Sequence, residues 1–297
     1  MQPFASIPVL EDARVLDRPA DLLGHAGGLL TRSRRLANAL HGVWLGHPLH
    51  PALVQLPIGT WASAGLLDAL PGLRRLPGGR VAAGVLVTAG LASAGPTAAA
   101  GLADVARLHR PQQRVGVAHA AANLLATGLY AGSLGARLRG DHRRGARLGW
   151  TGLLVLAVGG LLGGHLAFRQ AVGANHAEDA AHLLPRDWRE LCRLDELADG
   201  RPHLVLLDGT AVFVLRQGAR VYALWDKCTH LSGPLHQGMV GEVDGGTCVT
   251  CPWHGSTFRV ADGAVVDGPA TTPQPVLDVR TVDGRVQVRL PSRASTA

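Results

Sequence analysis

Charged and aromatic side chains are scarce in this 297-residue sequence. Charged residues make up 17% of the chain and aromatic residues 4%, whereas hydrophobic residues make up 47%. This charged fraction is low for a purely soluble protein, in which about 25% is usual. Four cysteines are too few for a small domain held together by disulfides. Residues 1–45 contain no apolar run of the kind that a cleavable signal peptide needs, so we expect no such signal.

The net charge of +7 is carried almost wholly by arginine. The arginines gather in short loops between apolar runs, and no basic stripe carries the interleaved aromatic side chains that nucleic-acid-binding surfaces use. Arginine-rich short loops are typical of the flanks of membrane helices. We therefore expect a lipid bilayer, and not nucleic acid, as a partner.

Four apolar segments of about 20 residues are long enough to cross a bilayer. They are residues 51–70, 81–105, 115–134 and 148–168. A soluble helix keeps a polar face, but residues 151–164 contain no charged side chain, so membrane helices are favoured over a soluble bundle. The loops are short, which predicts antiparallel neighbours. We predict an N-terminal segment at residues 1–45 and a four-helix transmembrane bundle at residues 46–172, with both termini on one side.

The remainder of the chain has a different pattern. A polar linker is predicted at residues 173–186, and short apolar runs separated by turn signals follow it. The turn signals include Asp208-Gly209, Asp262-Gly263 and Asp283-Gly284. Strands of about five to seven residues joined by Asp-Gly turns are typical of a small all-β domain with antiparallel sheets. We place this domain at residues 187–292, so the chain is predicted to be multidomain.

Two short pairs of metal-ligand residues lie inside the predicted β domain. They are Cys228-x-His230 and Cys251-x-x-His254. Tetrahedral zinc can use cysteine and histidine together. An iron–sulfur cluster with four cysteines would need another loop cysteine, whereas a 2Fe–2S cluster with two cysteines on one iron and two histidines on the other needs one of each from two loops. The other two cysteines, Cys192 and Cys248, are interpreted as small buried hydrophobes.

The stretches "CTHLSGPLHQG" and "CPWHGSTF" closely resemble the two cluster-binding loops of Rieske iron–sulfur proteins. The resemblance extends over about residues 187–292 and includes a later segment, "DGPATTPQP", that covers the cluster in that family. It implies that Cys228 and Cys251 bind one iron and that His230 and His254 bind the other. It also assigns further residues to the surroundings of the cluster, namely Thr229, Leu231, Trp253, Gly255, Ser256 and Pro269.

Two departures from the high-potential Rieske proteins bear on the redox potential. Those proteins carry an extra cysteine in each loop, joined as a disulfide, and the corresponding residues here are Gly233 and Trp253. Phe258 replaces a tyrosine that donates a hydrogen bond, although Ser256 is retained as a donor. Fewer donors leave more negative charge uncompensated on the sulfur atoms, so the resemblance implies a low-potential, ferredoxin-type centre.

The first apolar segment opens with "HPLHPALVQLPIG", which resembles an uncharacterised bacterial four-helix membrane family over about residues 45–175. In an up-down bundle His47, His50, His119 and His165 all fall near one membrane face. Ionisable residues at membrane depth are candidates for function, and these are candidates for a haem or quinone site or for a non-haem metal. His119 and His165 are the preferred pair, with Asn123 as a second contact of His119. Histidines that hydrogen-bond to backbone or headgroups at the interface are the alternative.

The sequence therefore predicts a membrane-anchored Rieske electron-transfer protein, a carrier more than an enzyme. Its expected partners are a redox protein or the quinone pool, and the lipid bilayer. The alternative is a quinol- or haem-linked membrane oxidoreductase with the histidine site in the bundle. A third interpretation is that the bundle only anchors the ferredoxin-type domain near a partner. A multi-pass cell-membrane location is expected, with the Rieske domain on the cytoplasmic side together with the N-terminus.

Overall fold

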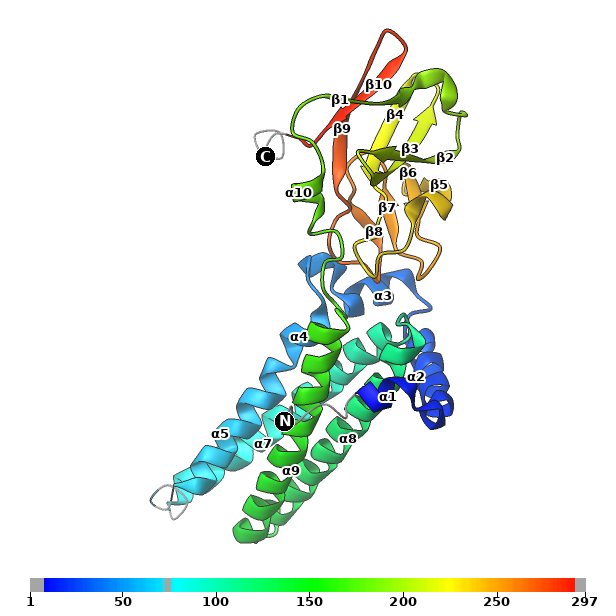
Figure 1. Cartoon of the computed structure of the whole chain (residues 1–297). Coiled ribbons are helices and arrows are strands. Elements are labelled where there is room, and N and C mark those ends of the chain that lie inside the picture. Colours follow the sequence, from blue (N-terminus) through cyan, green and yellow to red (C-terminus); the bar gives the residue numbers. More distant parts are fainter. Residues whose placement is uncertain (1–7, 71, 73–75, 292–297) are drawn as a thin grey trace, which may run out of the picture. The chain divides into compact units, whose positions relative to one another are not determined.

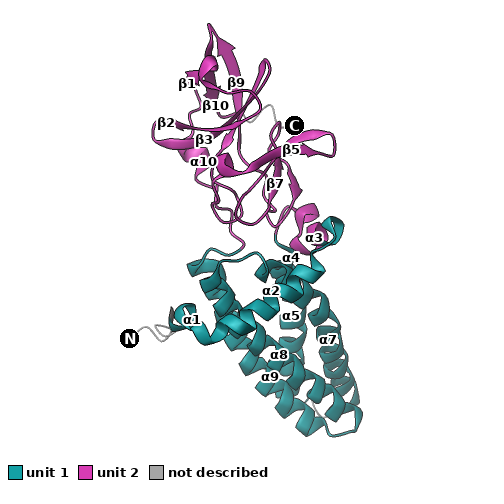
Figure 2. Ribbon diagram, turned by 90° about the vertical axis from the view of Figure 1, so that its right-hand side faces the viewer, with its two compact units in different colours: residues 1–36, 48–172 teal, residues 37–47, 173–297 magenta. Residues whose placement is uncertain are grey.

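The computed structural model describes residues 8–70, 72 and 76–291 (Figure 1). The chain divides into two compact units, which Figure 2 shows in different colours. Unit 1 comprises residues 1–36 and 48–172, and unit 2 comprises residues 37–47 and 173–297. Unit 2 thus includes a short stretch that precedes the first predicted membrane segment. Residues 1–7 of the predicted N-terminal segment and residue 292 of the predicted β domain lie outside the described residues.

Unit 1 is helical, and all four predicted apolar segments lie in helices. Its helices are α1 (Pro8–Asp12), α2 (Asp17–Leu30), α4 (Leu49–Leu53), α5 (Gln55–Ala69), α7 (Pro77–Val105), α8 (Arg110–Leu138) and α9 (His142–Gly164). A π-helical turn, η3 (His165–Arg169), continues α9. The helix α8 starts earlier than predicted because His109 and Gln112 form a reciprocal capping box at its N-terminus. Asp141 caps α9 by accepting a hydrogen bond from the Arg144 backbone N–H.

Among the described residues, two helical stretches are long and apolar enough to cross a membrane by length and composition, Pro77–Val105 and His142–Arg169. The helix α5 has 15 residues, fewer than a bilayer-spanning helix needs. The helical region is therefore confirmed, with two membrane-capable helices in it.

Small residues let the helices of unit 1 approach one another closely. The Trp61 ring stacks on the Tyr130 ring with centroids 4.1 Å apart and planes 8° apart. A side chain at Gly90 would collide with Trp61, and one at Gly152 would lie 3.0 Å from Tyr130. Because each ring occupies the space above a glycine, α5 packs against α7 and α8 packs against α9 along their lengths.

A buried ion pair joins α5 to α8. The Arg137 guanidinium donates to both carboxylate oxygens of Asp68, with the Nη1–Oδ1 distance at 3.2 Å. Their side chains are 4% and 7% exposed. Arg137 also donates to Ser133, which donates to the Gly145 carbonyl on α9. The ion pair thus extends into a polar chain that links three helices, and neither charge has water to replace its partner.

Unit 2 contains two antiparallel sheets. The six-stranded sheet has the order β1 (Arg189–Arg193), β10 (Arg285–Arg289), β9 (Val276–Val282), β4 (Arg220–Trp225), β3 (Thr210–Gln217) and β2 (Pro202–Leu207). The four-stranded sheet has the order β5 (Met239–Val243), β6 (Gly246–Thr250), β7 (Thr257–Arg259) and β8 (Val265–Asp267). The predicted turns Asp208-Gly209 and Asp283-Gly284 join β2 to β3 and β9 to β10, and all four turn residues have positive φ. The all-β prediction for this region is confirmed.

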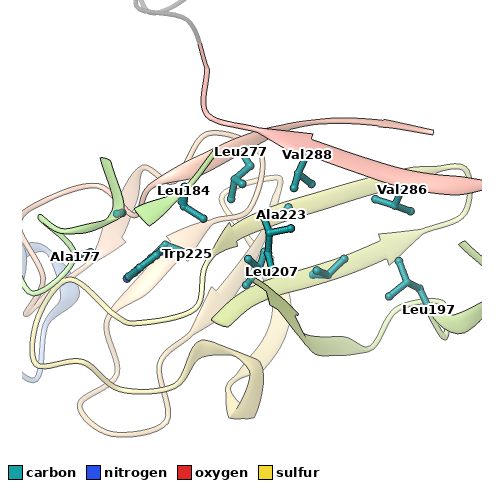
Figure 3. Close-up of a cluster of buried hydrophobic side chains, with 12 residues drawn as sticks. Ala177, Leu184, Leu197, Leu207, Ala223, Trp225, Leu277, Val286 and Val288 are labelled. Atoms are coloured by element: carbon teal, nitrogen blue, oxygen red, sulfur yellow. The ribbon is translucent and has the colours of Figure 1, made fainter. Parts of the chain in front are cut away.

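Two hydrophobic clusters fill unit 2. One lies against the six-stranded sheet and includes Trp225, Leu277 and Val286 (Figure 3). The segment predicted as a polar linker also contributes to it, because Ala177, Ala180 and Leu184 are buried there, Ala180 within the short helix α10 (Ala180–Leu183). The second cluster contains Phe258, Leu235 and two of the predicted ligands, Cys228 and Cys251. The ligand loops are therefore anchored in the hydrophobic core of unit 2.

We predict that Asp68→Leu alone lowers the free energy of unfolding of the purified protein by about 3–5 kcal/mol, because it leaves the Arg137 charge buried and unpaired. The double variant Asp68→Leu/Arg137→Met should recover most of the loss. The matched control is Asp21→Leu, which removes the partner of Arg110 in an exposed pair and should cost less than about 1 kcal/mol. Denaturant titration in detergent measures all three, and equal losses in Asp68→Leu and Asp21→Leu would contradict the prediction.

Candidate metal centre

The two ligand loops have the same backbone geometry. The Cys228 N–H donates to the Gly233 carbonyl five residues later at 2.9 Å, and the Cys228 carbonyl accepts from the Ser232 N–H. In the second loop, the Cys251 N–H donates to the Ser256 carbonyl at 2.8 Å, and its carbonyl accepts from the Gly255 N–H. The fourth residue after each cysteine has positive φ, 65° at Ser232 and 81° at Gly255. Each loop therefore closes into the same tight ring around its cysteine.

These rings aim backbone N–H groups at both sulfur atoms. The N–H groups two and three residues after each cysteine donate to its sulfur; they belong to His230 and Leu231 in the first loop and to Trp253 and His254 in the second. Such donors stabilise thiolate, the form of cysteine that binds metal. The Cys228 thiol donates to the Cys251 sulfur, which raises the pKa of Cys228 and lowers the pKa of Cys251 to about 7. The two buried sulfur atoms are thus adjacent and poised for one shared metal.

The two histidines form a second, separate pair. The ring centroids of His230 and His254 are 5.1 Å apart, with planes at 82°. The Nδ1 atom of His230 is buried, whereas both side chains keep a partly exposed edge. With metal–imidazole bonds of about 2 Å and ring centres about 1 Å further out, two imidazoles on one tetrahedral metal have centroids about 5 Å apart. The spacing of the pair therefore fits two histidine ligands on one iron.

The pairwise arrangement distinguishes between the metals left open by the sequence. Within the described part of the chain, no three histidine, cysteine, aspartate or glutamate side chains group together as a tetrahedral zinc site would require. Two sulfurs at one place and two imidazoles at another match the two irons of a 2Fe–2S cluster with mixed ligands. The residues present thus fit this cluster better than tetrahedral zinc.

Gly233 brings the first loop close to the second. A side-chain carbon at Gly233 would lie 2.6 Å from the Cys251 sulfur and 3.2 Å from the Trp253 ring. No side chain fits there unless both the Cys251 sulfur and Trp253 move. The indole of Trp253 is 50% exposed and covers the glycine from outside.

A third segment, residues 267–275, ties the two ligand loops together. Thr229 donates its hydroxyl to the Thr272 carbonyl at 2.9 Å and its N–H to the Gln274 side chain at 3.2 Å. The Ala270 N–H donates to the Ser256 hydroxyl oxygen at 3.0 Å, which leaves the Ser256 hydroxyl hydrogen available for another acceptor. The neighbouring Pro269 is buried. The segment is therefore held to both loops.

Sequence reasoning missed several polar residues that hold these loops. Gln274, which is 2% exposed, donates to the carbonyls of Trp225 and Lys227 just before the first loop. Asp226 accepts from the backbone and ring nitrogens of His236, both at 2.7 Å. These residues stand outside the ligand motifs, and no spacing rule marks them. Gln274 had one signal, because it lies in a segment that the family resemblance marked.

Both chain segments that lead from unit 1 into unit 2 bind near the ligand loops of unit 2. Asn38, on α3 (Arg34–His41), donates to the Val266 carbonyl and accepts from the Gly268 N–H, beside Pro269. On the other connection, the His176 N–H donates to the Thr229 carbonyl at 3.0 Å. Asp179 pairs with Lys227, the residue before Cys228. The first loop and the covering segment are therefore each fixed by a connecting segment.

The four histidines predicted near one membrane face have different surroundings. His47 belongs to unit 2, and the other three belong to unit 1. His119 lies beside His50, with ring centroids 6.1 Å apart. The predicted contact of His119 with Asn123 is present. His165 contacts Glu11 on α1 at 2.8 Å instead of facing His119, because α1, which was not predicted, places a carboxylate there. The structure thus brings together His50 and His119, and not the preferred pair.

Comparison with known proteins gives two family matches. The Rieske [2Fe-2S] domain family matches residues 187–283, and a family described as a predicted membrane protein (DUF2231) matches residues 46–176. The anthranilate 1,2-dioxygenase ferredoxin subunit of Burkholderia cepacia is 33% identical over 104 residues, which cover 35% of this chain and 93% of that protein. Apoptosis-inducing factor 3 of Homo sapiens is 29% identical over 112 residues, 37% of this chain but 18% of that protein.

A solved structure matches a similar share of this chain. The ferredoxin of carbazole 1,9a-dioxygenase from Nocardioides aromaticivorans IC177 is 29% identical and covers 35% of this chain and 98% of its own, with a TM-score of 0.32. The match with the Burkholderia ferredoxin subunit spans nearly the whole of that protein, whereas the match with apoptosis-inducing factor 3 spans less than a fifth of it.

We predict that Gln274→Ala destabilises the two ligand loops, because it leaves the Thr229 N–H and two carbonyls without their buried partner. Each unsatisfied group costs about 1–3 kcal/mol. Hydrogen exchange at residues 226–232 should become faster, and the midpoint of thermal unfolding of unit 2 should fall. The matched control is Gln287→Ala, whose side chain bonds only the exposed Arg280 among the contacts described. Unchanged exchange in the first loop of Gln274→Ala would contradict the prediction.

Proposed function

Because the chain belongs to the Rieske [2Fe-2S] family, we propose that it is a membrane-anchored electron-transfer protein. It would carry single electrons between a donor at the membrane and a redox partner. The observation that carries the proposal is the pairing of ligands in unit 2, two buried cysteines with adjacent sulfurs and two histidines with partly exposed edges. The cluster, when bound, would supply reversible one-electron chemistry, and the residues of the chain would hold it and control access to it.

The two ligand cysteines are buried, whereas the two ligand histidines are partly exposed. Cys228 and Cys251 hold one iron inside the hydrophobic cluster, where water is excluded and the backbone N–H donors offset thiolate charge. His230 and His254 hold the other iron as neutral imidazoles. Both histidines are partly exposed, which supports them as the place where a partner exchanges electrons.

The proposed potential is low for a Rieske centre. Phe258 is fully buried in the same cluster as Cys228 and Cys251 and offers no hydrogen-bond donor. Gly233 and Trp253 stand where a disulfide would be needed in the high-potential proteins. With Ser256 as the remaining side-chain donor, negative charge on the reduced centre is poorly compensated. We propose a potential nearer about −150 mV than about +300 mV, the bounds of the family.

Membrane anchoring is assigned to unit 1. Two membrane-capable helices and the match of residues 46–176 to a membrane-protein family support this assignment. We propose that α5, α7, α8 and α9 together form a multi-pass four-helix bundle, with α5 completed by α4 to reach the required length. None of the four cysteines forms a disulfide, which favours the reducing, cytoplasmic side for unit 2. The N-terminus would share that side, because the number of spans is even.

We propose a redox protein as the partner of unit 2, since the chain matches a dioxygenase ferredoxin subunit over 93% of that subunit. The quinone pool is the alternative partner on the membrane side. A second candidate function is a quinol- or haem-linked membrane oxidoreductase. The proximity of His50 and His119 inside unit 1 favours it, because imidazoles bind haem iron and hydrogen-bond to quinones.

We predict that the full-length protein, purified in detergent, contains two irons and two sulfides per chain and gives the electron paramagnetic resonance signal of a Rieske centre when reduced. His230→Ala should abolish that signal. Cys248→Ala is the control, since Cys248 is as buried as the ligand Cys228 but lies on the strand before the second loop, and it should keep the signal. Zinc in place of iron, or an unchanged signal in His230→Ala, would refute the proposed centre.

We predict that Ser256→Ala lowers the midpoint potential and that Phe258→Tyr raises it. Ser256→Ala removes a hydroxyl donor, so the reduced state is stabilised less. Phe258→Tyr adds a donor beside the buried cysteines, so the reduced state is stabilised more. Protein-film voltammetry of the full-length protein measures both shifts. Ser93→Ala, a serine change on α7 in unit 1, is the control and should leave the potential unchanged. A wild-type potential close to the upper bound of the family would contradict the role given to these residues.

A further inference from the structure

Unit 1 contains a second pair of imidazoles, away from the cluster ligands in sequence. His50 on α4 and His119 on α8 have ring centroids 6.1 Å apart and planes at 81°. Neither residue has a role in binding the cluster of unit 2. Their surroundings are alike in two respects, the carbonyl that binds each ring and the glycine beside it.

Each ring has one nitrogen bound to a main-chain carbonyl of a neighbouring helix. The His50 Nδ1 lies 2.9 Å from the Thr97 carbonyl on α7, and the His119 Nδ1 lies 2.8 Å from the Gly159 carbonyl on α9. A carbonyl oxygen can only accept, so Nδ1 carries the hydrogen in both rings. In the neutral imidazole the Nε2 atom of each ring is then a lone-pair acceptor. Histidines that bind metals use this arrangement, with the second ring N–H donated to a carbonyl or carboxylate.

A glycine lies under each ring, four residues after the carbonyl that the ring binds. A side-chain carbon at Gly101 would lie 2.8 Å from the His50 Nδ1, and one at Gly163 would lie 3.1 Å from the His119 Cε1. The same arrangement therefore occurs on two different helices, with Thr97 and Gly101 on α7 and with Gly159 and Gly163 on α9. The carbonyl and the glycine together fix the position and the tautomer of the imidazole.

Asn123 does not occupy the lone pair of His119. Its amide nitrogen donates to the His119 carbonyl at 2.8 Å and lies 3.4 Å from the ring Nδ1 and 3.2 Å from Nε2. An atom on the axis of the Nε2 lone pair would be much closer to Nε2 than to Nδ1. The near-equal distances place the amide beside the ring, where it restricts ring rotation and leaves the Nε2 lone pair accessible.

The distance between the ring centroids fits one coordination geometry better than the other. With metal–imidazole bonds of about 2 Å, two imidazoles on opposite sides of one metal have ring centroids about 6 Å apart, against about 5 Å on a tetrahedral metal. The observed 6.1 Å matches the first arrangement, whereas the 5.1 Å between His230 and His254 matches the second.

We propose that His50 and His119 bind one redox metal between their Nε2 atoms, from opposite sides. A haem iron and a bare copper ion share this ligand chemistry, and both accept imidazole. Such a centre would give unit 1 a redox group of its own. The proposal deepens the second candidate function, on which it rests, and it does not depend on the cluster being present.

The test uses the full-length protein purified in detergent, with His50→Gln and His119→Gln as the variants. Glutamine can still donate to the Thr97 or Gly159 carbonyl, so a purely structural role of the imidazole would survive the change. His165→Gln is the matched control, because the His165 Nε2 is already bound to Glu11. Iron, copper and zinc are measured by plasma mass spectrometry, haem by the pyridine haemochrome, and the cluster by its paramagnetic resonance signal in the same samples.

The wild type and His165→Gln should contain metal beyond the two cluster irons. A third iron with a haemochrome identifies haem, and copper without one identifies the bare ion. Each of the other two variants should lose that metal by about tenfold or more while keeping the cluster signal. Absence of additional metal after growth with added haem precursor and copper, zinc as the additional metal, or metal retained in both variants would overturn the proposal. Loss of the cluster signal alone would count against the proposed function and not against this site.

Discussion

The hydrogen bond from each ligand cysteine N–H to the carbonyl five residues later is the constraint on which the cluster site depends. It closes both loops into the same ring, and the ring directs the next N–H groups onto the sulfur. The histidine stands two residues after the cysteine in the first loop and three residues after it in the second, so Trp253 takes the place that His230 has. The same backbone therefore carries ligands on different positions, and their rings meet nearly at right angles.

Histidine serves three different purposes in this chain, and its partners distinguish them. His230 and His254 lie beside the buried sulfurs with partly exposed edges. His165 and His236 bond carboxylates, Glu11 and Asp226, which orient a ring and occupy its nitrogen. The rings of His50 and His119 bond main-chain carbonyls across helix contacts. In each of these four rings one nitrogen bonds the acceptor, which orients the ring and leaves the other nitrogen outside that bond.

Local features of the sequence predicted a large part of this structure. Cysteine–histidine spacing, Asp-Gly turns and apolar runs each act within a few residues, so the ligand loops, the β unit and the helical segments were predictable. Asn38 reaches Val266 across 228 positions, and a lone asparagine in a polar helix carries no sign of its partner. Glu11 was missed for the same reason, which is why His165 was expected to face His119. Contacts between distant polar residues depend on packing that no local pattern encodes.

Gly233 and Trp253 together determine how readily this site can change over evolution. A cysteine at position 233 would press its first carbon against the Cys251 sulfur and the indole of Trp253, which already fills the space beside it. A cysteine at position 253 alone would uncover the glycine and add a solvent-facing thiol. Either single substitution therefore impairs the protein. Changing both positions removes the contact with the indole but leaves the 2.6 Å contact with the Cys251 sulfur, so a disulfide-bearing form also requires the two loops to shift apart. This double requirement is a barrier between the two forms of the site.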